Sequence, residues 1–140
     1  MSKEKKKLAI IVHSGTFDKL YCAFILGTAA TAMDIETHMY FTFWGLNALV
    51  KEAMDKTGLP AIYKDVEDKI KTKFAEIKYP TPYEMLKRMK TTGLVTIYAC
   101  SPTMAVFGIT KDDLIPEVDK IAGAAEFLDI SMQAETTIQV

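Results

Sequence analysis

The sequence predicts an α/β domain built on a mainly parallel five-stranded sheet. Short apolar runs rich in β-branched and aromatic residues alternate along the chain with longer segments of helical spacing. The chain has 140 residues, of which 49% are hydrophobic, so it can build one full core but not two ordinary domains. We therefore expect a single domain over residues 1–140, in which residues 55–80 are the candidate for an insertion or lid.

The first half of the chain supplies two strands and two helices. Residues 8–12 form a continuous apolar run, which is typical of a central strand buried on both faces. Residues 17–33 are long enough for a helix and present a broad apolar face. Residues 35–43 are rich in Thr, Tyr and Phe, so they predict the second strand. Helical spacing then resumes over residues 46–54.

The second half continues the alternation after an ambiguous segment. Residues 61–80 combine apolar spacing by four with high, alternating charge, which favours a helix without defining it. Thr81 and Glu84 have the spacing of a capping box, which begins a helix that ends before Gly93. The remaining predicted elements are a third strand over 94–99, short helices over 101–107 and 110–115, a fourth strand over 118–121, a helix over 122–132 and a terminal strand over 136–140.

Charge and hydropathy exclude several classes of partner. The net charge of −1 gives no bulk attraction to nucleic acid, and Arg88 is the only arginine, the residue that leads in phosphate and base recognition. The longest uncharged stretch, residues 20–33, is too short to span a bilayer, so no membrane insertion is expected. The basic run over residues 3–7 lacks the apolar region of a signal peptide. We therefore expect a cytoplasmic protein whose two cysteines are free thiols.

Cys100 is the first candidate for chemistry. It follows the predicted third strand and precedes a predicted helix, for which Ser101 is a suitable cap and Pro102 a suitable first-turn residue. The partial positive charge of a helix N-terminus favours thiolate over thiol, and parallel α/β sheets carry their chemistry at the carboxyl ends of the strands. We therefore expect Cys100 to be a nucleophile presented on a surface loop. The alternative is a buried, inert thiol.

A second group of candidates follows the first strand. His13 could act as a base or orient the reacting group, or it could simply bond the nearby backbone. Ser14, Gly15 and Thr16 precede a helix and could bind an anion, although they match no nucleotide-binding fingerprint. If the strand order is that of flavodoxin, the first and third strands are neighbours at the topological switch point, and these residues lie beside Cys100.

Cys22 lies in the middle of an apolar stretch of the first predicted helix. An apolar core residue is the favoured interpretation, because free cysteine is among the most buried residue types. The alternative is a resolving thiol that forms a disulfide with Cys100. No pair among the cysteines and histidines has the spacing of metal ligands, so no metal site is expected. No cofactor is expected either.

Three segments and Cys100 carry a family resemblance over nearly the whole chain. The segments are Ile-Ile-Val-His-Ser-Gly-Thr-Phe-Asp at residues 10–18, Met-Tyr-Phe-Thr-Phe-Trp-Gly-Leu at residues 39–46 and Ala-Gly-Ala-Ala-Glu-Phe-Leu at residues 122–128. Together with Cys100 they resemble the DsrE/DsrF-like family, which includes the TusD-type sulfur-relay subunits. The aromatic segment is most similar to the branch often labelled oxidoreductase or peroxiredoxin-like. A true peroxiredoxin would need a Thr-x-x-Cys motif, which this sequence lacks.

The resemblance implies a flavodoxin-like three-layer domain that forms homo- or hetero-oligomers. It also implies that Cys100 holds sulfur as a persulfide, with His13 or the hydroxyls of Ser101 and Thr103 as groups that could orient it. The expected partners are sulfur donor and acceptor proteins, small persulfides or thiosulfate, and whether the chain turns over alone as a sulfurtransferase stays open. The alternatives are a thiol–disulfide oxidoreductase that uses Cys100 with Cys22, and a non-catalytic module that binds a small ligand at residues 14–16.

Overall fold

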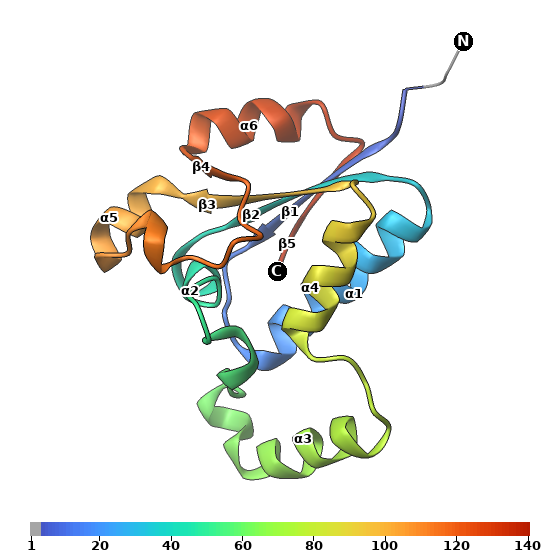
Figure 1. Ribbon diagram of the computed structural model, residues 1–140, viewed down its shortest axis with the longest axis vertical. Helices are drawn as coiled ribbons and strands as arrows, with labels where there is room; N and C mark the ends of the chain where they lie inside the picture. The colour runs from blue at the N-terminus through green and yellow to red at the C-terminus, as the bar shows by residue number, and fades with distance from the viewer. Residues whose placement is uncertain (1–3) are drawn as a thin grey trace.

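The computed structural model describes residues 4–140 and arranges them around one five-stranded sheet (Figure 1). The strands are β1 (Lys7–Val12), β2 (Glu36–Phe41), β3 (Val95–Cys100), β4 (Lys120–Ala122) and β5 (Thr136–Gln139). The α-helices are α1 (Phe17–Ala32), α2 (Phe43–Asn47), α3 (Glu67–Glu76), α4 (Pro82–Thr91), α5 (Ser101–Phe107) and α6 (Ala124–Met132). Short 3-10 helices occupy Met54–Lys56, Ala61–Val66 and Lys111–Asp113.

The sheet is the middle of three layers. Helix α6 covers one face, while α1 and α4 lie side by side on the other (Figure 1). Every neighbouring pair of strands is parallel, which confirms the predicted α/β class and five-stranded sheet. The central positions Ile10, Met39 and Ile97 are completely buried, as expected of strands covered on both faces. None of the helices within residues 4–140 has the length and apolar character that crossing a bilayer requires.

The strand order is β4-β3-β2-β1-β5, so β2 lies between β1 and β3. The expectation that β1 and β3 are neighbours, which assumed the flavodoxin order, is therefore wrong. The connections through α1 and α4 both step in the same direction across the sheet, and the chain reverses only when α6 crosses the other face to reach β5. The topological switch point consequently lies between β1 and β5, away from Cys100.

Strand β2 ends earlier than its composition predicts. Phe43 begins α2 with a φ of 47°, a left-handed value that is a real outlier for a bulky residue. The helix expected over residues 46–54 is replaced by the end of α2, a series of turns and the 3-10 helix Met54–Lys56. The chain therefore turns sharply at the carboxyl end of β2, directly beside the end of β3.

Two glycines lock the loops that follow β1 and β2 against each other. A Cβ atom at Gly15 would lie 2.1 Å from the carbonyl oxygen of Trp44, and one at Gly45 would lie 2.1 Å from that of Val12. The amide of Gly45 also donates to the carbonyl of His13 at 2.9 Å. Only glycine permits two backbones to approach this closely, so the two loops form one rigid unit.

Residues 55–80 pack beside α1, on the face of the sheet opposite α6 (Figure 1). Phe74 stacks on Tyr21 with ring centres 4.5 Å apart and meets Phe17 edge-on. Glu67 accepts hydrogen bonds from the amide of Leu59 and from Lys64. These contacts place the segment over the start of α1.

Helix α4 begins with the predicted capping box. The Thr81 hydroxyl accepts from the amide of Glu84, and the Glu84 carboxylate accepts from the amide of Thr81. Pro82 occupies the first turn, where its missing N–H costs nothing. The helix ends before Gly93, which has a positive φ of 74°.

Candidate functional site

Cys100 is the last residue of β3 and the N-cap of α5. The structure therefore makes Ser101 the first helical residue rather than the cap, so that part of the sequence prediction is wrong. The expected presentation on a surface loop is also wrong, because Cys100 is a free thiol with only 6% of its surface exposed. The end of β2 and the paired residue Ala122 of β4 flank it on either side.

The register of β2 and β3 decides which side chains surround the thiol. Tyr40 pairs with Tyr98, and side chains two residues apart on a strand share a face. Tyr40, Thr42 and Cys100 therefore project from the same face of the sheet. This is the face under α6, because Phe127 of α6 stacks on the Tyr40 ring with centres 4.6 Å apart.

The hydroxyls of Thr42 and Thr103 lie near the Cys100 sulfur and are hydrogen-bonded to each other. The Oγ1 atoms of Thr42 and Thr103 are 3.1 Å apart, and the amide of Phe43 donates to Thr103 Oγ1 at 3.1 Å. Each hydroxyl has one hydrogen to donate and two acceptor positions. One hydrogen joins the two threonines, so the other is free to point at Cys100, whichever residue supplies it.

Hydrogen-bond donors determine the acidity of Cys100. Burial has the largest single influence and raises its pKa, but the hydroxyls of Thr103, Thr42 and Tyr40 and the amide of Thr103 together outweigh burial and lower the pKa below its usual value. The Cys100 side chain forms no complete cap hydrogen bond within α5. The donors therefore surround the sulfur loosely, and they make the Cys100 thiol more acidic than an ordinary cysteine.

Tyr40, like Thr42, is a donor to Cys100 that was not predicted from the sequence. Its hydroxyl oxygen is buried and has no hydrogen-bond partner within residues 4–140. Burial and, after it, contact with Cys100 raise the pKa of Tyr40 far above its usual value, so the phenol stays neutral and keeps its hydrogen. Tyr40 could have been found only from the register of β2 against β3, which a single sequence does not contain.

His13 is not assembled with Cys100. It is exposed at the end of β1, where its ring lies 5.6 Å from the ring of Phe43. Strand β2 separates β1 from β3, and two strand spacings amount to about 10 Å. The sequence prediction that places His13 beside the thiol is therefore wrong, because it depended on the flavodoxin strand order.

Ser14, Gly15 and Thr16 lie at the switch point between β1 and β5. The backbone amides of His13 and Ser14 donate to the carbonyl of Val140 there, at 2.9 and 3.3 Å. The three loop residues line a shallow hollow of about 410 Å³ together with Lys19, Trp44, Asn47 and Pro60. This hollow is separate from Cys100, which is not among its lining residues.

Cys22 is exposed on α1, so its interpretation as a core residue is wrong. It lines an apolar groove of about 430 Å³ between α1 and α3, with Phe17, Tyr21, Ile25, Leu26, Leu59, Ile70 and Phe74 among its neighbours. The sheet lies between Cys22 and Cys100, because α1 and α6 cover opposite faces. A disulfide needs Cα atoms within about 7 Å, which this arrangement does not provide.

Of the two predicted orienting hydroxyls on α5, the one on Thr103 acts on the sulfur. Ser101 instead lies near Gly123, whose Cβ position would be 3.9 Å from the Ser101 hydroxyl. Gly123 is the N-cap of α6, so the starts of α5 and α6 converge at the ends of β3 and β4. Both helix N-termini favour negative charge at this edge of the sheet.

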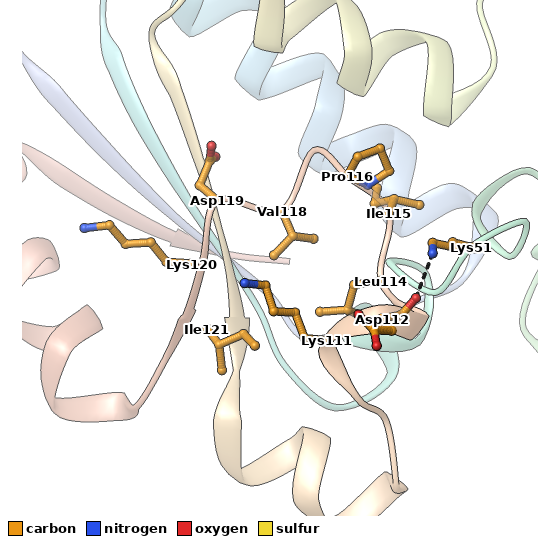
Figure 2. A pocket seen from close by; sticks show the side chains of 10 residues that line it. All are labelled: Lys51, Lys111, Asp112, Leu114, Ile115, Pro116, Val118, Asp119, Lys120 and Ile121. Carbon is orange, nitrogen blue, oxygen red and sulfur yellow. Dashed lines mark hydrogen bonds between the residues drawn. The ribbon is translucent and has the colours of Figure 1, made fainter.

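Other polar groups lie apart from the thiol. A hollow of about 550 Å³ beside β4 is lined by three lysines and two aspartates around several apolar side chains (Figure 2); the charged residues are Lys51, Lys111, Lys120, Asp112 and Asp119. Cys100 is not part of its lining. Residues 4–140 contain no cluster of three or more His, Cys, Asp or Glu side chains that could hold a metal ion.

Comparisons with known proteins identify the family and agree with the fold. The model of the DsrE/DsrF/DrsH-like family matches residues 4–92 and 67–139. The sulfur carrier protein DsrE2 of Allochromatium vinosum is 29% identical, covering 98% of this chain and 99% of the relative. The uncharacterized protein YrkE of Bacillus subtilis is also 29% identical, covering 91% and 92% of the two chains.

A solved structure shows the same fold at lower identity. The protein of unknown function MTH1491 from Methanobacterium thermoautotrophicum superposes with a TM-score of 0.59 at 15% identity, covering 97% of this chain and all of that one. The two family matches together extend from residue 4 to residue 139 and include every strand of the sheet. The chain therefore belongs to the DsrE/DsrF/DrsH-like family.

Proposed function

We propose that this protein is a sulfur carrier that holds sulfur as a persulfide on Cys100 and passes it between thiol partners. The observation that carries the proposal is a free thiol at the end of β3 whose pKa is lowered by the surrounding hydroxyls and the Thr103 amide. Membership of the family and the relative named as a sulfur carrier support the same function.

The chemistry needs no cofactor and balances in two exchanges. The Cys100 thiolate attacks the outer sulfur of a donor persulfide, R–S–SH, forming Cys100–S–SH and releasing RS⁻. An acceptor thiolate then attacks the outer sulfur of that persulfide, takes it as R′–S–SH and regenerates the Cys100 thiolate. Both steps are thiol exchange reactions, so their rates follow the thiolate fraction of the attacking group, the pKa of the leaving group and access.

The donors around Cys100 suit both exchanges. In the first exchange they raise the fraction of Cys100 that is thiolate at neutral pH. In the second exchange Cys100 is the leaving group, and a thiol of lower pKa leaves faster. The free hydrogen of the Thr42–Thr103 pair and the Thr103 amide therefore assist both loading and unloading.

Access to the thiol is the remaining requirement. Cys100 is buried, so a partner has to uncover it at the edge where α5 begins. Phe43 and Trp44, which are 48% and 58% exposed, follow Thr42 directly and could contact such a partner. We also propose that the protein forms a homo-oligomer, because the short edge strands β4 and β5 leave backbone groups to be covered. We further propose that it acts in the cytoplasm, where a carrier thiol stays reduced.

Intact mass spectrometry after incubation with polysulfide tests this function. We expect the reduced protein to gain one or more sulfur atoms, Cys100→Ser to gain none at this site and Cys22→Ser to behave as the wild type. Alkylation of Cys100 with iodoacetamide under the same conditions confirms that the reagent reaches the thiol. Alkylation without any sulfur addition would overturn the proposal. Loss of two hydrogens that needs both cysteines would point to thiol–disulfide chemistry instead.

A further inference from the structure

The hydroxyl of Tyr40 is a buried donor without an acceptor. The residue is only 7% exposed, and its hydroxyl oxygen has no hydrogen-bond partner within residues 4–140. Buried polar atoms are nearly always paired, and an unpaired one in a folded protein calls for an explanation. Its position next to the free thiol suggests one.

The geometry places this hydroxyl close to Cys100 but not in a complete hydrogen bond with it. Tyr40 pairs with Tyr98, and Cys100 lies two residues further along β3 on the same face. Strand spacing and rise put the Cα atoms of Tyr40 and Cys100 roughly 8 Å apart, most of which a tyrosine side chain can span. The two groups influence each other's acidity, yet no hydrogen bond to Sγ is completed.

A persulfide would bring an acceptor closer to Tyr40. A sulfur–sulfur bond extends the side chain by about 2.0 Å beyond Sγ. The outer sulfur of a persulfide is acidic, so at neutral pH it is an anion that seeks a hydrogen-bond donor. In the part of the chain that the structure describes, Tyr40 supplies a buried hydroxyl on this face that has no hydrogen-bond partner.

We propose that Tyr40 is a positioning residue that donates its hydroxyl hydrogen to the outer sulfur of a Cys100 persulfide. The inference rests on the proposed function, since it concerns the loaded form of the carrier. The outer sulfur is then held on the inner side of the site, beneath α6. It stays there as a stabilised anion until a partner exposes it.

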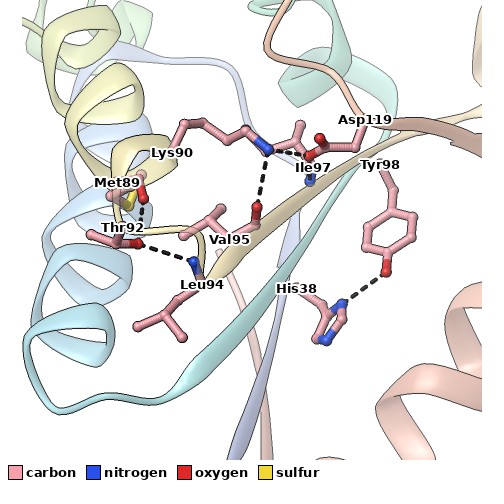
Figure 3. A network of polar contacts seen from close by, with 9 residues as sticks. All are labelled: His38, Met89, Lys90, Thr92, Leu94, Val95, Ile97, Tyr98 and Asp119. Carbon is pink, nitrogen blue, oxygen red and sulfur yellow. Dashed lines mark hydrogen bonds and ion pairs between the residues drawn. The ribbon is translucent and has the colours of Figure 1, made fainter.

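Tyr98 shows what an ordinary tyrosine on this face does. Its hydroxyl is 2.8 Å from His38 Nδ1 (Figure 3), and the other ring nitrogen of His38 is 2.7 Å from Glu36. The hydroxyl of Tyr98 is therefore satisfied by the protein itself. Tyr40 is held just as firmly, because its ring stacks on Phe127 at an interplanar angle of 15°, but its hydroxyl is left for a ligand.

The test compares Tyr40→Phe with Tyr98→Phe as a matched control. Each protein is loaded with polysulfide, freed of reagent and treated with cyanide, which attacks the outer sulfur to give thiocyanate and the Cys100 thiolate. We expect Tyr40→Phe to lose its sulfur about tenfold faster than the wild type, as fits the loss of one hydrogen bond to a charged group. We expect Tyr98→Phe to lose it at the wild-type rate.

A spectroscopic measurement on the wild type removes any dependence on how the variants fold. In protein with carbon-labelled tyrosine, we expect the NMR signal of the Tyr40 ring carbon that bears the hydroxyl to shift on loading, while that of Tyr98 stays in place. If Cys100 takes up sulfur normally but the Tyr40 signal does not shift, this inference is overturned and the carrier function is left intact. The same holds if Tyr40→Phe and the wild type lose their sulfur at equal rates. Failure of the wild type to take up sulfur on Cys100 would overturn both.

Discussion

The shared hydrogen of Thr42 and Thr103 leads to a prediction that two single substitutions and their combination can test. In the wild type the two hydroxyls bond each other, and one hydrogen remains for Cys100. In Thr42→Val the hydrogen of Thr103 no longer has Thr42 as an acceptor and is free to turn to the sulfur. One threonine donor therefore remains, as in the wild type, and we expect the pKa of Cys100 to change little.

The double variant Thr42→Val/Thr103→Val removes that donor altogether. A hydrogen bond to a charged group contributes about 1.5–3 kcal/mol, and 1.4 kcal/mol is a factor of ten. We therefore expect the double variant to hold about ten- to a hundredfold less thiolate than the wild type at a fixed pH below the Cys100 pKa. Thr103→Val also leaves the amide of Phe43 without an acceptor, so it is expected to lose about 1–3 kcal/mol of folding stability.

Ultraviolet absorbance of the thiolate against pH measures the effect directly. All variants carry Cys22→Ser, so that Cys100 is the thiol being titrated, and Thr103→Ser is the control that retains a hydroxyl. Circular dichroism at each pH shows that the proteins stay folded. If the two single variants each raised the pKa of Cys100 and their effects summed to that of the double variant, the shared-hydrogen argument would be refuted.

Three further predictions test other parts of the structure. We expect His13→Ala to load sulfur at the wild-type rate, because β2 separates His13 from Cys100; a large loss in the polysulfide assay would contradict the strand order. We expect Gly45→Ala to lower the free energy of unfolding by about 3 kcal/mol or more in denaturant titration, because its Cβ would meet a backbone oxygen. Gly93 has open space around it but a positive φ, so we expect Gly93→Ala to lower the free energy of unfolding by about 1 kcal/mol. The hydrogen bonds from Lys64 and the Leu59 amide lower the pKa of Glu67 in the folded protein. The contribution of this carboxylate to stability is therefore present above the ordinary glutamate pKa and is lost as the pH falls through the lower folded value. We expect Glu67→Gln to unfold at a lower temperature than the wild type at neutral pH, and we expect the difference to vanish in acid.

The parts of the fold that local patterns determine were predictable from the sequence. The capping box of Thr81 and Glu84 depends on atoms within one helical turn, and the structure contains both of its hydrogen bonds. The alternation of apolar strands with helices likewise gave the parallel sheet. Strand order was not predictable, because a helical connection is long enough to return the chain on either side of β1, and the choice depends on packing between distant elements.

The candidate site was predicted in part for the same reason. Cys100 was identified because its strand and helix are consecutive in sequence, whereas Tyr40 and Thr42 come from another strand and needed the register. Cys22 was misplaced because α1 is apolar over much of its circumference, part of which faces α3 instead of the sheet. The exposure of Cys22 depends on where α3 packs along α1, and helical periodicity does not predict that position.

Because Cys100 is buried, local opening of the structure can limit the rate at which the thiol reacts. Any reagent or partner attacks only the small population of molecules in which local opening has uncovered the sulfur. At low reagent concentration the observed rate is the chemical rate multiplied by the opening equilibrium, and at high concentration it reaches a ceiling equal to the opening rate. The protein can therefore show saturation without forming any complex, and the rate of local opening around Cys100 then limits its chemistry.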